Sequence, residues 1–224
     1  MHKYENISQP VIKRLPRYYR FLGELLDKGV TRISSRELSD KMGFTASQIR
    51  QDLNCFGGFG QQGYGYAVQS LYNEIGHILG LDHCYKAILI GAGNLGKAVA
   101  VHMSFEKRGF KLIGIFDNDP AKVGTVIRNI TVTDLDKLEE FCKENKTDVA
   151  IFTVPKAAAP SIADRLYQLG IRNYWNFSHY DLSINYDDII VENVHLNDSL
   201  MILCYKISDA CDEPEDAQEF RKAD

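Results

Sequence analysis

The hydrophobic positions of the first 80 residues recur at helical spacings. From Ser8 onward, apolar side chains fall three or four positions apart, at Ile12, Leu15, Tyr19, Leu22, Leu25 and Leu26. This spacing predicts a helix. Pro16 has no backbone N–H to donate, so we expect the main helix to begin at this residue and to end at Lys28, before Gly29.

Two short capped helices are expected next. Residues 34–37 form a capping box, and Gly43 is placed to end the helix that follows it. A second box at residues 45–48 opens another helix. Two capped helices joined by a glycine turn are typical of a helix-turn-helix, whose second helix enters the major groove of DNA. The polar side chains expected to contact base edges there are Ser47, Gln48, Arg50 and Gln51.

Residues 56–66 contain five glycines interleaved with aromatic side chains. This composition predicts a tight β-hairpin, the wing of a winged helix. A phosphate-binding loop is excluded, since no Gly-Lys-Ser/Thr follows. The alternative is that the capped helices form only a dimerisation or lid domain. A helical pattern from Val68 to Leu79 then predicts a linker helix that ends at Gly80.

Beyond residue 81, short apolar runs alternate with helical patterns. The runs are residues 87–90, 112–116, 149–154, 171–177 and 189–194, and the helical patterns are residues 95–105, 135–142 and 162–169. Such alternation predicts an α/β domain with a parallel sheet and right-handed crossovers. We expect a Rossmann arrangement, although the sequence leaves the strand order open.

A glycine-rich turn follows the first of these apolar runs. It consists of Gly91, Ala92, Gly93, Asn94, Leu95 and Gly96. In a dinucleotide-binding fold the first glycine permits the turn, and the second lets the backbone approach a pyrophosphate. The third lets the helix pack against its strand, and the helix N-terminus faces the phosphates. We therefore expect all six residues to contribute to a cofactor site.

Asp117 ends the second apolar run, 21 positions after Gly96. A carboxylate there accepts hydrogen bonds from the ribose hydroxyls of NAD(H). The adjacent Asn118 and Asp119 offer no cation for a 2′-phosphate, so NADH and NAD+ are favoured over NADP(H). The alternative is that Asp117 only caps a turn before Pro120.

Two further segments end predicted strands, where ligands bind in open α/β sheets. The first contains Thr153, Val154 and Pro155, and we expect it to line the adenosine and phosphate side of the site. The second contains Asn176, which we expect on the nicotinamide side. Both segments remain open to the simpler interpretation of ordinary loops.

Charge is distributed unevenly over a chain of ordinary globular composition, with 45% hydrophobic and 25% charged residues. Residues 1–66 hold 10 Lys or Arg against 6 Asp or Glu, although the whole chain carries a net charge of −4. A basic N-terminal portion on an acidic protein indicates a polyanionic partner for that portion. Residues 208–224 form an acidic tail, which we expect to be disordered.

The remaining composition excludes several classes of protein. The chain has no membrane-length apolar run and no signal-peptide pattern, so no membrane association and a cytoplasmic location are expected. Its five cysteines are scattered and never spaced as CxxC, which argues against a disulfide framework or a metal site.

An apolar helix is expected over residues 196–207, and it needs a surface to cover it. Exchange into a second subunit supplies one, and packing on its own domain is the alternative. The expected organisation is therefore a DNA-binding domain at 1–80, a nucleotide-binding domain at 81–195, a dimerisation helix at 196–207 and a tail at 208–224.

These motifs, taken in order, resemble the Rex family of redox-sensing transcriptional repressors. The resemblance covers about residues 8–207 and rests on the sequences at residues 14–18, 34–35, 48–53, 56–57, 63–66, 91–96, 116–117, 153–155, 176–177 and 191–194. It implies a homodimer with a swapped C-terminal helix, a winged helix and a Rossmann domain. It also implies that the protein binds operator DNA while NADH is scarce and leaves it when NADH binds.

The resemblance also implies roles for individual residues. Those expected at the DNA are Arg14, Gln62, Gly63 and Tyr64, with the last two in the minor groove. His102 stands where a tyrosine often lies near the nicotinamide, and His195 stands where an aspartate often joins a switch network with Arg20. Gln51, Gln61 and Gln62 replace basic residues of other members, which predicts a shallower salt dependence of DNA binding or an altered operator preference.

Two other functions compete with that of a repressor. An NAD-dependent dehydrogenase needs a substrate domain and a general acid or base, and too little chain remains to form such a domain. A CoA-binding domain shares the glycine-rich turn but leaves Asp117 unexplained. We therefore expect a non-enzymatic NADH sensor.

Overall fold

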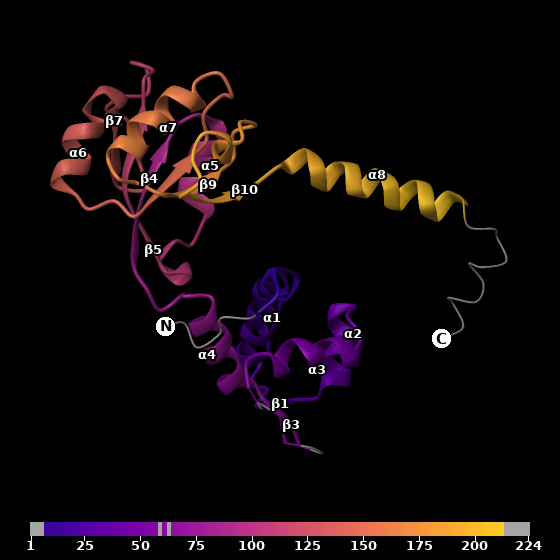
Figure 1. The fold of residues 1–224 in the computed structure, drawn as a ribbon. Helices are drawn as coiled ribbons and strands as arrows, with labels where there is room; N and C mark the ends of the chain where they lie inside the picture. The colour runs from indigo at the N-terminus through magenta and orange to yellow at the C-terminus, as the bar shows by residue number, and fades with distance from the viewer. Residues whose placement is uncertain (1–6, 58–59, 62–63, 213–224) are drawn as a thin grey trace. The chain divides into compact units, whose positions relative to one another are not determined.

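The computed structural model describes residues 7–57, 60–61 and 64–212, and it contains two compact units (Figure 1). The chain passes from the first to the second between Cys84 and Tyr85, rather than after residue 80. Glu106–Phe110 also groups with the first unit. There Gly109 lies close to the backbone of Gly80 and His83, both of which belong to that unit.

The first unit is a winged helix followed by one more helix. Its elements in chain order are α1 (Gln9–Asp27), β1 (Arg32–Ile33), α2 (Ser35–Met42), α3 (Ala46–Asn54), β2 (Gly60–Gln61), β3 (Gly65–Ala67) and α4 (Val68–Ile78). The three short strands form an antiparallel sheet in the order β1-β3-β2. The expected wing hairpin is β2 with β3, and α4 is the expected linker helix.

The ends of α2 and α3 follow from their capping residues. Ser34 Oγ accepts from Glu37 N at 3.1 Å, and Glu37 Oε2 accepts from Ser34 N at 2.7 Å, so this capping box is complete. Gly43 ends α2 in the left-handed region, with a φ of 67°. Thr45 caps α3 by accepting from Gln48 N at 3.1 Å. The second box is only half formed, because the Gln48 side chain turns to Asp52 instead.

The prediction that Pro16 begins the first helix is wrong, because α1 starts at Gln9 and holds Pro16 in its interior. A proline there removes one backbone hydrogen bond from the helix. Packing along one face offsets this loss, since side chains before and after Pro16 are buried. The buried residues are Val11, Leu15, Tyr18, Leu22 and Leu25.

Two glycines let α1 and α4 pack with their tyrosines in contact. The rings of Tyr19 and Tyr72 stack with centroids 4.2 Å apart. A Cβ on Gly76 would lie 3.1 Å from the Tyr19 ring, and a Cβ on Gly23 would lie 3.3 Å from the Tyr72 ring. Burial and the Tyr72 hydroxyl raise the pKa of Tyr19 to about 12.

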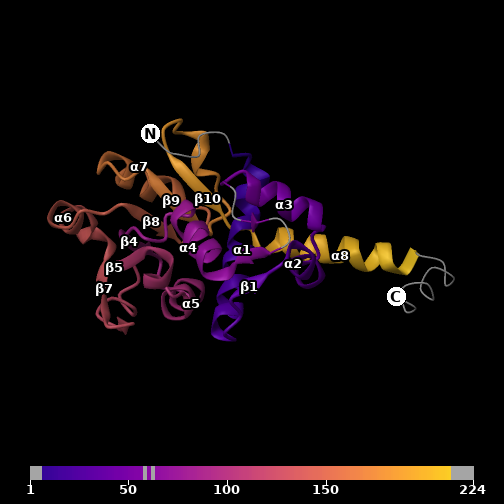
Figure 2. The same cartoon turned by 90° about the horizontal axis from the view of Figure 1, so that it is seen from below.

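The second unit is built on a seven-stranded sheet. Its strands are β4 (Tyr85–Ile90), β5 (Phe110–Asp117), β6 (Val126–Ile127), β7 (Ile130–Asp134), β8 (Val149–Phe152), β9 (Asn173–Asn176) and β10 (Ile190–Asn193). Their order is β10-β9-β8-β4-β5-β7-β6, and Figure 2 shows β8, β9 and β10 side by side. Only the β6–β7 pair is antiparallel among the strand pairs whose register is defined in the described residues. This order is that of a Rossmann fold with an added edge hairpin.

The strand order decides which helix covers which face of the sheet. From β4 to β5 the chain moves one way across the sheet, and from β8 to β9 it moves the other way. Right-handed crossovers therefore place α5 (Asn94–His102) and α7 (Ala159–Gln168) on opposite faces. The face under α7 and α6 (Leu138–Glu144) is one continuous core that includes Ile88, Ile90, Phe116, Phe152 and Leu166.

Two strand elements had no clear signal in the sequence. The β6–β7 hairpin turns at Arg128 and Asn129, which adopt the left-handed conformation with φ of 51° and 63°. These are not the glycines that usually mark such a turn. The other, β1, is only two residues long and exists because it pairs with β3.

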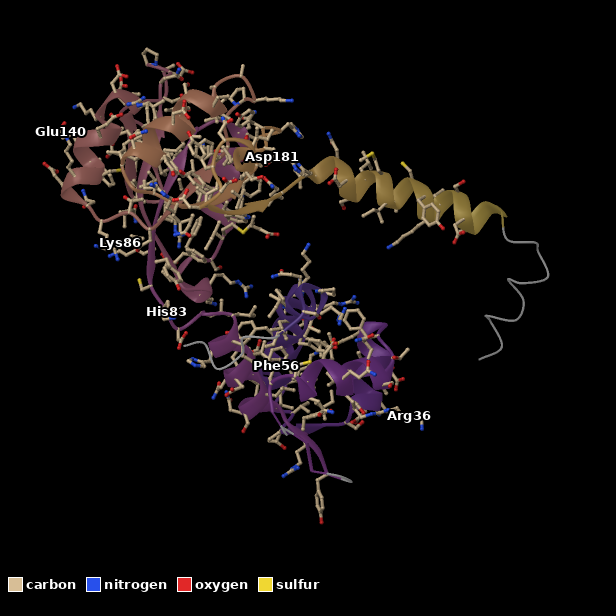
Figure 3. The ribbon with its side chains drawn as sticks, in the orientation of Figure 1. Arg36, Phe56, His83, Lys86, Glu140 and Asp181 are labelled. Carbon is tan, nitrogen blue, oxygen red and sulfur yellow. The ribbon has the colours of Figure 1, made fainter. Side chains whose placement is uncertain are left out.

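The last described helix, α8 (Leu196–Asp212), has no buried side chain from Leu196 to Ala210. Leu200, Ile202 and Leu203 are 50–60% exposed, and Figure 3 shows the side chains standing out around the helix. It continues past Ile207 into the segment expected to be a tail, of which residues 213–224 lie outside the described chain. Among the described helices, none combines the length and the apolar character that crossing a membrane requires.

Candidate functional site

The glycine turn between β4 and α5 is tight at its first and third glycines. Gly91 has a φ of 98°, and a Cβ there would lie 2.8 Å from the carbonyl oxygen of Thr153. A Cβ on Gly96 would lie 1.9 Å from the carbonyl oxygen of Gly91. Neither position accepts a side chain without moving the backbone, so both glycines are needed for the fold itself.

The second glycine differs, because its missing side chain leaves space for a ligand. A Cβ on Gly93 would meet no atom within 4 Å, and its φ of −70° suits any residue. Gly93 is also the N-cap of α5, and no side chain caps this helix end. Backbone amides and the helix dipole at such an end favour an anionic group.

A cavity of about 430 Å³ opens in front of this turn. It lies at the carboxyl ends of β4, β5 and β8, where the strand order changes direction and where open α/β sheets bind ligands. Its lining includes Gly91, Gly93, Asn94, Leu95, Phe116, Asp117, Asn118, Lys122, Thr153, Val154, Pro155 and Phe177. The glycine turn, the acidic residue and the segment after β8 are thus brought together as expected.

Asp117 is buried at the end of β5, with a relative exposure of 6%. Its Oδ2 accepts from Ala92 N at 2.6 Å, and its Oδ1 accepts from Asp119 N at 2.9 Å. The carboxylate therefore ties the glycine turn to the loop after β5. Both oxygens also accept from the Lys122 ammonium, Oδ1 at 3.4 Å and Oδ2 at 3.3 Å, so a ribose hydroxyl bound here would share the carboxylate with that lysine.

Lys122 was missed by the sequence analysis. Its Nζ lies 3.3 Å from Asp117 Oδ2 and 3.3 Å from Asp119 Oδ2. The adjacent residues Asn118 and Asp119 carry no positive charge, so no cation was expected near Asp117. A turn in the backbone brings Lys122 back to the cavity. The signal available was a lysine three residues after an acidic turn residue.

The segment after β8 contributes in two ways. The Thr153 hydroxyl donates to the carbonyl oxygen of Gly91 at 2.7 Å, which locks the glycine turn against β8. Val154 and Pro155 form part of the cavity wall. Thr153 is thus a structural support of the turn as well as part of its lining.

Asn176 does not line the cavity, contrary to its expected place beside a nicotinamide. It is fully buried, and its amide nitrogen donates to Tyr180 O and to Asn193 Oδ1, both at 2.8 Å. Its Oδ1 accepts from the Ser178 backbone N–H and hydroxyl. Because these bonds hold the loop after β9 against β10, it is the next residue, Phe177, that reaches the cavity.

His102 and His195, expected near the nicotinamide and in a switch, also lie outside the cavity lining. His102 is exposed at the end of α5. The His195 ring stacks with that of His179, with centroids 5.9 Å apart. Ser183 holds the pKa of Asp181, labelled in Figure 3, below its usual value, and the charge of His195 adds to this. The proposed partner of His195, Arg20, is exposed in the first unit.

The exposed surface of α3 holds three of the expected DNA contacts. Ser47, Arg50 and Gln51 are exposed, and Arg50 donates to Ser35 Oγ at 3.1 Å. Tyr64 at the wing is 69% exposed, and its carbonyl accepts from Arg32 at 3.1 Å. Gln62 and Gly63, the other expected wing contacts, lie outside the described residues.

Arg14 and Gln48, also expected at DNA, are held instead by a buried acid that the sequence analysis overlooked. The Arg14 guanidinium donates to both oxygens of Asp52 at 2.7 Å, and Gln48 Nε2 donates to Oδ1 at 2.8 Å. The Tyr18 hydroxyl donates to Oδ2 at 3.0 Å. Asp52 lies on the buried face of α3 with Ile49 and Leu53. A carboxylate is rarely buried without a partner, so its position among apolar residues in the sequence was a signal that it is paired.

These hydrogen bonds keep Asp52 ionised. Burial acts to raise the pKa of Asp52, but the hydrogen bonds from Arg14, Gln48 and Tyr18 outweigh it and lower that pKa below its usual value. Burial and the hydrogen bond to Asp52 raise the pKa of Tyr18. The network therefore fixes α3 to α1 through one negative charge.

Two family models match the chain in the order of its two units. The model for the N-terminus of a putative DNA-binding protein matches residues 6–54, and that for a CoA binding domain matches residues 82–180. The second model is thus named for domains that bind CoA, and it matches the part of the chain that contains the glycine turn. A CoA-binding domain was one of the two alternatives to a repressor.

Relatives are similar over nearly the whole chain. The Redox-sensing transcriptional repressor Rex of Thermoanaerobacter pseudethanolicus is 56% identical over 209 residues, which are 93% of each chain. The protein of the same name in Caldicellulosiruptor saccharolyticus is 49% identical over 98% of this chain and 100% of its own.

Solved structures agree with these relatives. A structure described as RSP in complex with beta-NAD+ and operator DNA is 54% identical, covers 97% of both chains and has a TM-score of 0.83. One described as RSP in complex with beta-NADH is 51% identical and covers 97% of this chain and 99% of its own, with a TM-score of 0.82. By sequence over nearly its whole length and by fold in both units, the chain belongs to the Rex family of redox-sensing transcriptional repressors.

Proposed function

We propose that this chain is a transcriptional repressor that senses the ratio of NADH to NAD+. It binds operator DNA through the winged helix while NADH is scarce, and it releases the DNA when NADH occupies the cavity of the second unit. Solved relatives bound to NAD+ with operator DNA, and to NADH, support this proposal. The chain is a regulator rather than an enzyme, as its relatives are named repressors.

The single observation that carries the cofactor assignment is the cavity at the glycine turn. Gly93 leaves room for a pyrophosphate at the uncapped start of α5, and Asp117 stands where a ribose diol is recognised. Val154, Pro155 and Phe177 supply apolar walls for the rings. In this proposal, a second subunit or a shift of the loop after β9 brings His102 and Asn176 beside the nicotinamide.

A redox sensor must tell the two forms of one ligand apart. Reduction removes the positive charge of the nicotinamide ring, so an apolar environment disfavours NAD+ through the cost of desolvating a charge. A hundredfold preference for NADH needs only about 2.7 kcal/mol. We assign this discrimination to the apolar part of the site around Phe177.

Release of DNA requires two global states that bind NADH unequally. We propose that α8 inserts into a second copy of the chain, so that the two wings are spaced by the dimer and NADH changes that spacing. The exposed apolar side chains of α8 support this assignment. Arg20 and His195 are proposed to couple the units, and binding to chromosomal DNA implies a cytoplasmic location.

At the DNA, we assign base contacts to Ser47, Arg50 and Gln51 and a minor-groove contact to Tyr64, with Gln62 and Gly63 beside it. Arg14 and Gln48 have a different part. Their bonds to Asp52 hold α3 at a fixed angle to α1. They reach the DNA only through the side-chain atoms that these bonds leave free.

The test is a titration of DNA release. A fluorescent duplex is first selected from a random library by binding to the full chain, and its anisotropy is then followed as NADH, NAD+ or CoA is added. We expect NADH to release the duplex and NAD+ to do so only at about hundredfold higher concentration. Release by CoA alone contradicts the proposal.

Gly93→Arg fills the cavity without disturbing the turn, because no atom of the protein lies near the added Cβ. We expect this variant to bind the duplex with unchanged affinity and to ignore NADH. The same substitution at Gly124 would not serve as a control, because Gly124 has a φ of 85° and any side chain there would strain the backbone. Lys143→Met, at an exposed position of α6 outside the cavity lining, should keep the NADH response.

A further inference from the structure

A lysine lies against the acidic residue of the nucleotide cavity. The Lys122 ammonium bridges two carboxylates, at 3.3 Å from Asp117 Oδ2 and 3.3 Å from Asp119 Oδ2. Lys122 and Asp117 both line the cavity, and the Lys122 side chain remains 37% exposed. The ammonium is therefore accessible to a ligand while it neutralises part of the acidic charge.

The backbone holds Lys122 in this position. Its N–H donates to the carbonyl oxygen of Asp119 at 2.9 Å, and its carbonyl accepts from the Thr125 hydroxyl at 2.6 Å. Asp119 Oδ1 in turn accepts from Ala121 N at 3.0 Å. The short turn after β5 thus presents Lys122 and Asp119 as a fixed pair beside Asp117.

An acid and a cation at this end of the second Rossmann strand favour different nucleotides. A carboxylate accepts from the ribose diol of NAD(H) and repels a 2′-phosphate, whereas a nearby cation accommodates that phosphate. Asp117 and Asp119 alone would present two negative charges, and Lys122 reduces the total to one. Partly buried charges are screened less than exposed ones, so this difference reaches a bound ligand.

We propose that Lys122 is a specificity-determining residue that weakens the rejection of 2′-phosphorylated dinucleotides. NADPH then binds this cavity more weakly than NADH, but less weakly than it would beside carboxylates without a counterion. The inference rests on the proposed function, because it takes NADH as the ligand of this cavity.

The test compares NADPH with NADH by calorimetric titration of the full chain, and its readout is the ratio of the two Kd values. Lys122→Met keeps the stem of the side chain but removes its charge. We expect the ratio Kd(NADPH)/Kd(NADH) to rise about tenfold, which corresponds to ~1.4 kcal/mol. Asp119→Asn, whose amide oxygen still accepts from Ala121 N, should lower the ratio by a similar factor.

Lys111→Met is the matched control, because it makes the same change at the exposed opposite end of β5. Both nucleotides are titrated into one preparation, so partial unfolding of a variant leaves the ratio unaffected. A ratio that stays unchanged in Lys122→Met, or that rises equally in Lys111→Met, overturns the inference. If the wild-type chain binds no NADH, the proposed function itself fails.

Discussion

At the scale of single residues, Asp52 carries the most consequential contacts of the first unit. Its carboxylate is buried to 1% side-chain exposure, and three donors from α1 and α3 surround it. A buried charge is tolerated only when it is paired and hydrogen-bonded. Loss of the carboxylate leaves Arg14, Tyr18 and Gln48 without their shared acceptor.

Asp52→Ala should therefore lower the free energy of unfolding of the first unit. Breaking a buried ion pair costs about 3 kcal/mol. Because the Arg14 side chain is 23% exposed, we expect the loss of stability to be somewhat smaller than that value. Urea unfolding followed by circular dichroism measures it. Asp40→Ala, at an exposed position on α2, should change stability by less than about 0.5 kcal/mol.

The same comparison has a defined pH dependence. The pKa of Asp52 is lowered in the folded state, so its stabilisation is present above the usual carboxyl pKa and is lost as the pH falls through the folded value. We expect the difference between wild type and Asp52→Ala to be largest near neutral pH and to shrink below about pH 4. A difference that grows on acidification contradicts the assignment of the ion pair.

The glycines of the turn after β4 should separate into two kinds when each is replaced by alanine. Gly96→Ala places a Cβ 1.9 Å from the Gly91 carbonyl oxygen and should destabilise the second unit by several kcal/mol, about as much as other severe core substitutions. Gly93→Ala meets no atom within 4 Å and should leave the melting temperature unchanged. Thermal unfolding of both variants checks this, and equal losses would show that the turn is not packed as described.

At the scale of elements, α1 shows packing overriding a local signal. Pro16 is exposed, yet the helix continues through it because residues on the opposite face are buried on both sides of it. Among them, Leu15 and Leu22 have no exposed area. The low helix propensity of proline costs a few kcal/mol at most. The free energy gained by burying several large apolar side chains exceeds this cost.

Pro16→Ala should consequently stabilise the first unit. An interior proline costs about 3 kcal/mol in a helix, and its stiffening of the unfolded chain offsets about 1 kcal/mol of this. We expect a net gain of about 2 kcal/mol in the free energy of unfolding, measured by urea titration. Pro10→Ala, in the first turn of α1 where a proline costs little, is the control and should show no gain.

At the scale of the whole molecule, α8 is left without a partner in the described chain. Leu196, Leu200 and Leu203 are each at least 50% exposed and lie three or four residues apart, which places them on one face. Exposed apolar surface of this extent marks an interaction site. The proposed occupant is a second copy of the chain.

The double variant Leu200→Asp/Leu203→Asp should abolish the dimer, because two carboxylates cannot be buried in an apolar interface. Sedimentation analysis should give a monomer, and affinity for duplex DNA should fall as the two wings cease to bind together. Asn197→Asp adds a charge to the same helix at an exposed polar position and should leave a dimer. A double variant that remains dimeric contradicts the role assigned to α8.

Some features follow from the amino-acid sequence by itself, because they depend on local chemistry. Ser34 with Glu37, and Gly43, set the ends of α2 through their own side chains and backbone. The glycines of the turn are marked locally at two positions, because Gly91 has a φ of 98° and a Cβ on Gly96 would meet the carbonyl oxygen of Gly91, five positions earlier. The alternation of apolar runs with helical patterns likewise determines the fold class.

Other features were decided only by tertiary structure. Asp52 meets Arg14, 38 positions away in the chain, so no local pattern could identify the pair. The Asn176 amide bonds to Tyr180, Ser178 and Asn193, so a strand-end position alone did not place it in the cavity lining. Local sequence determines what a side chain can bond, whereas the packing of distant segments determines which partner it finds.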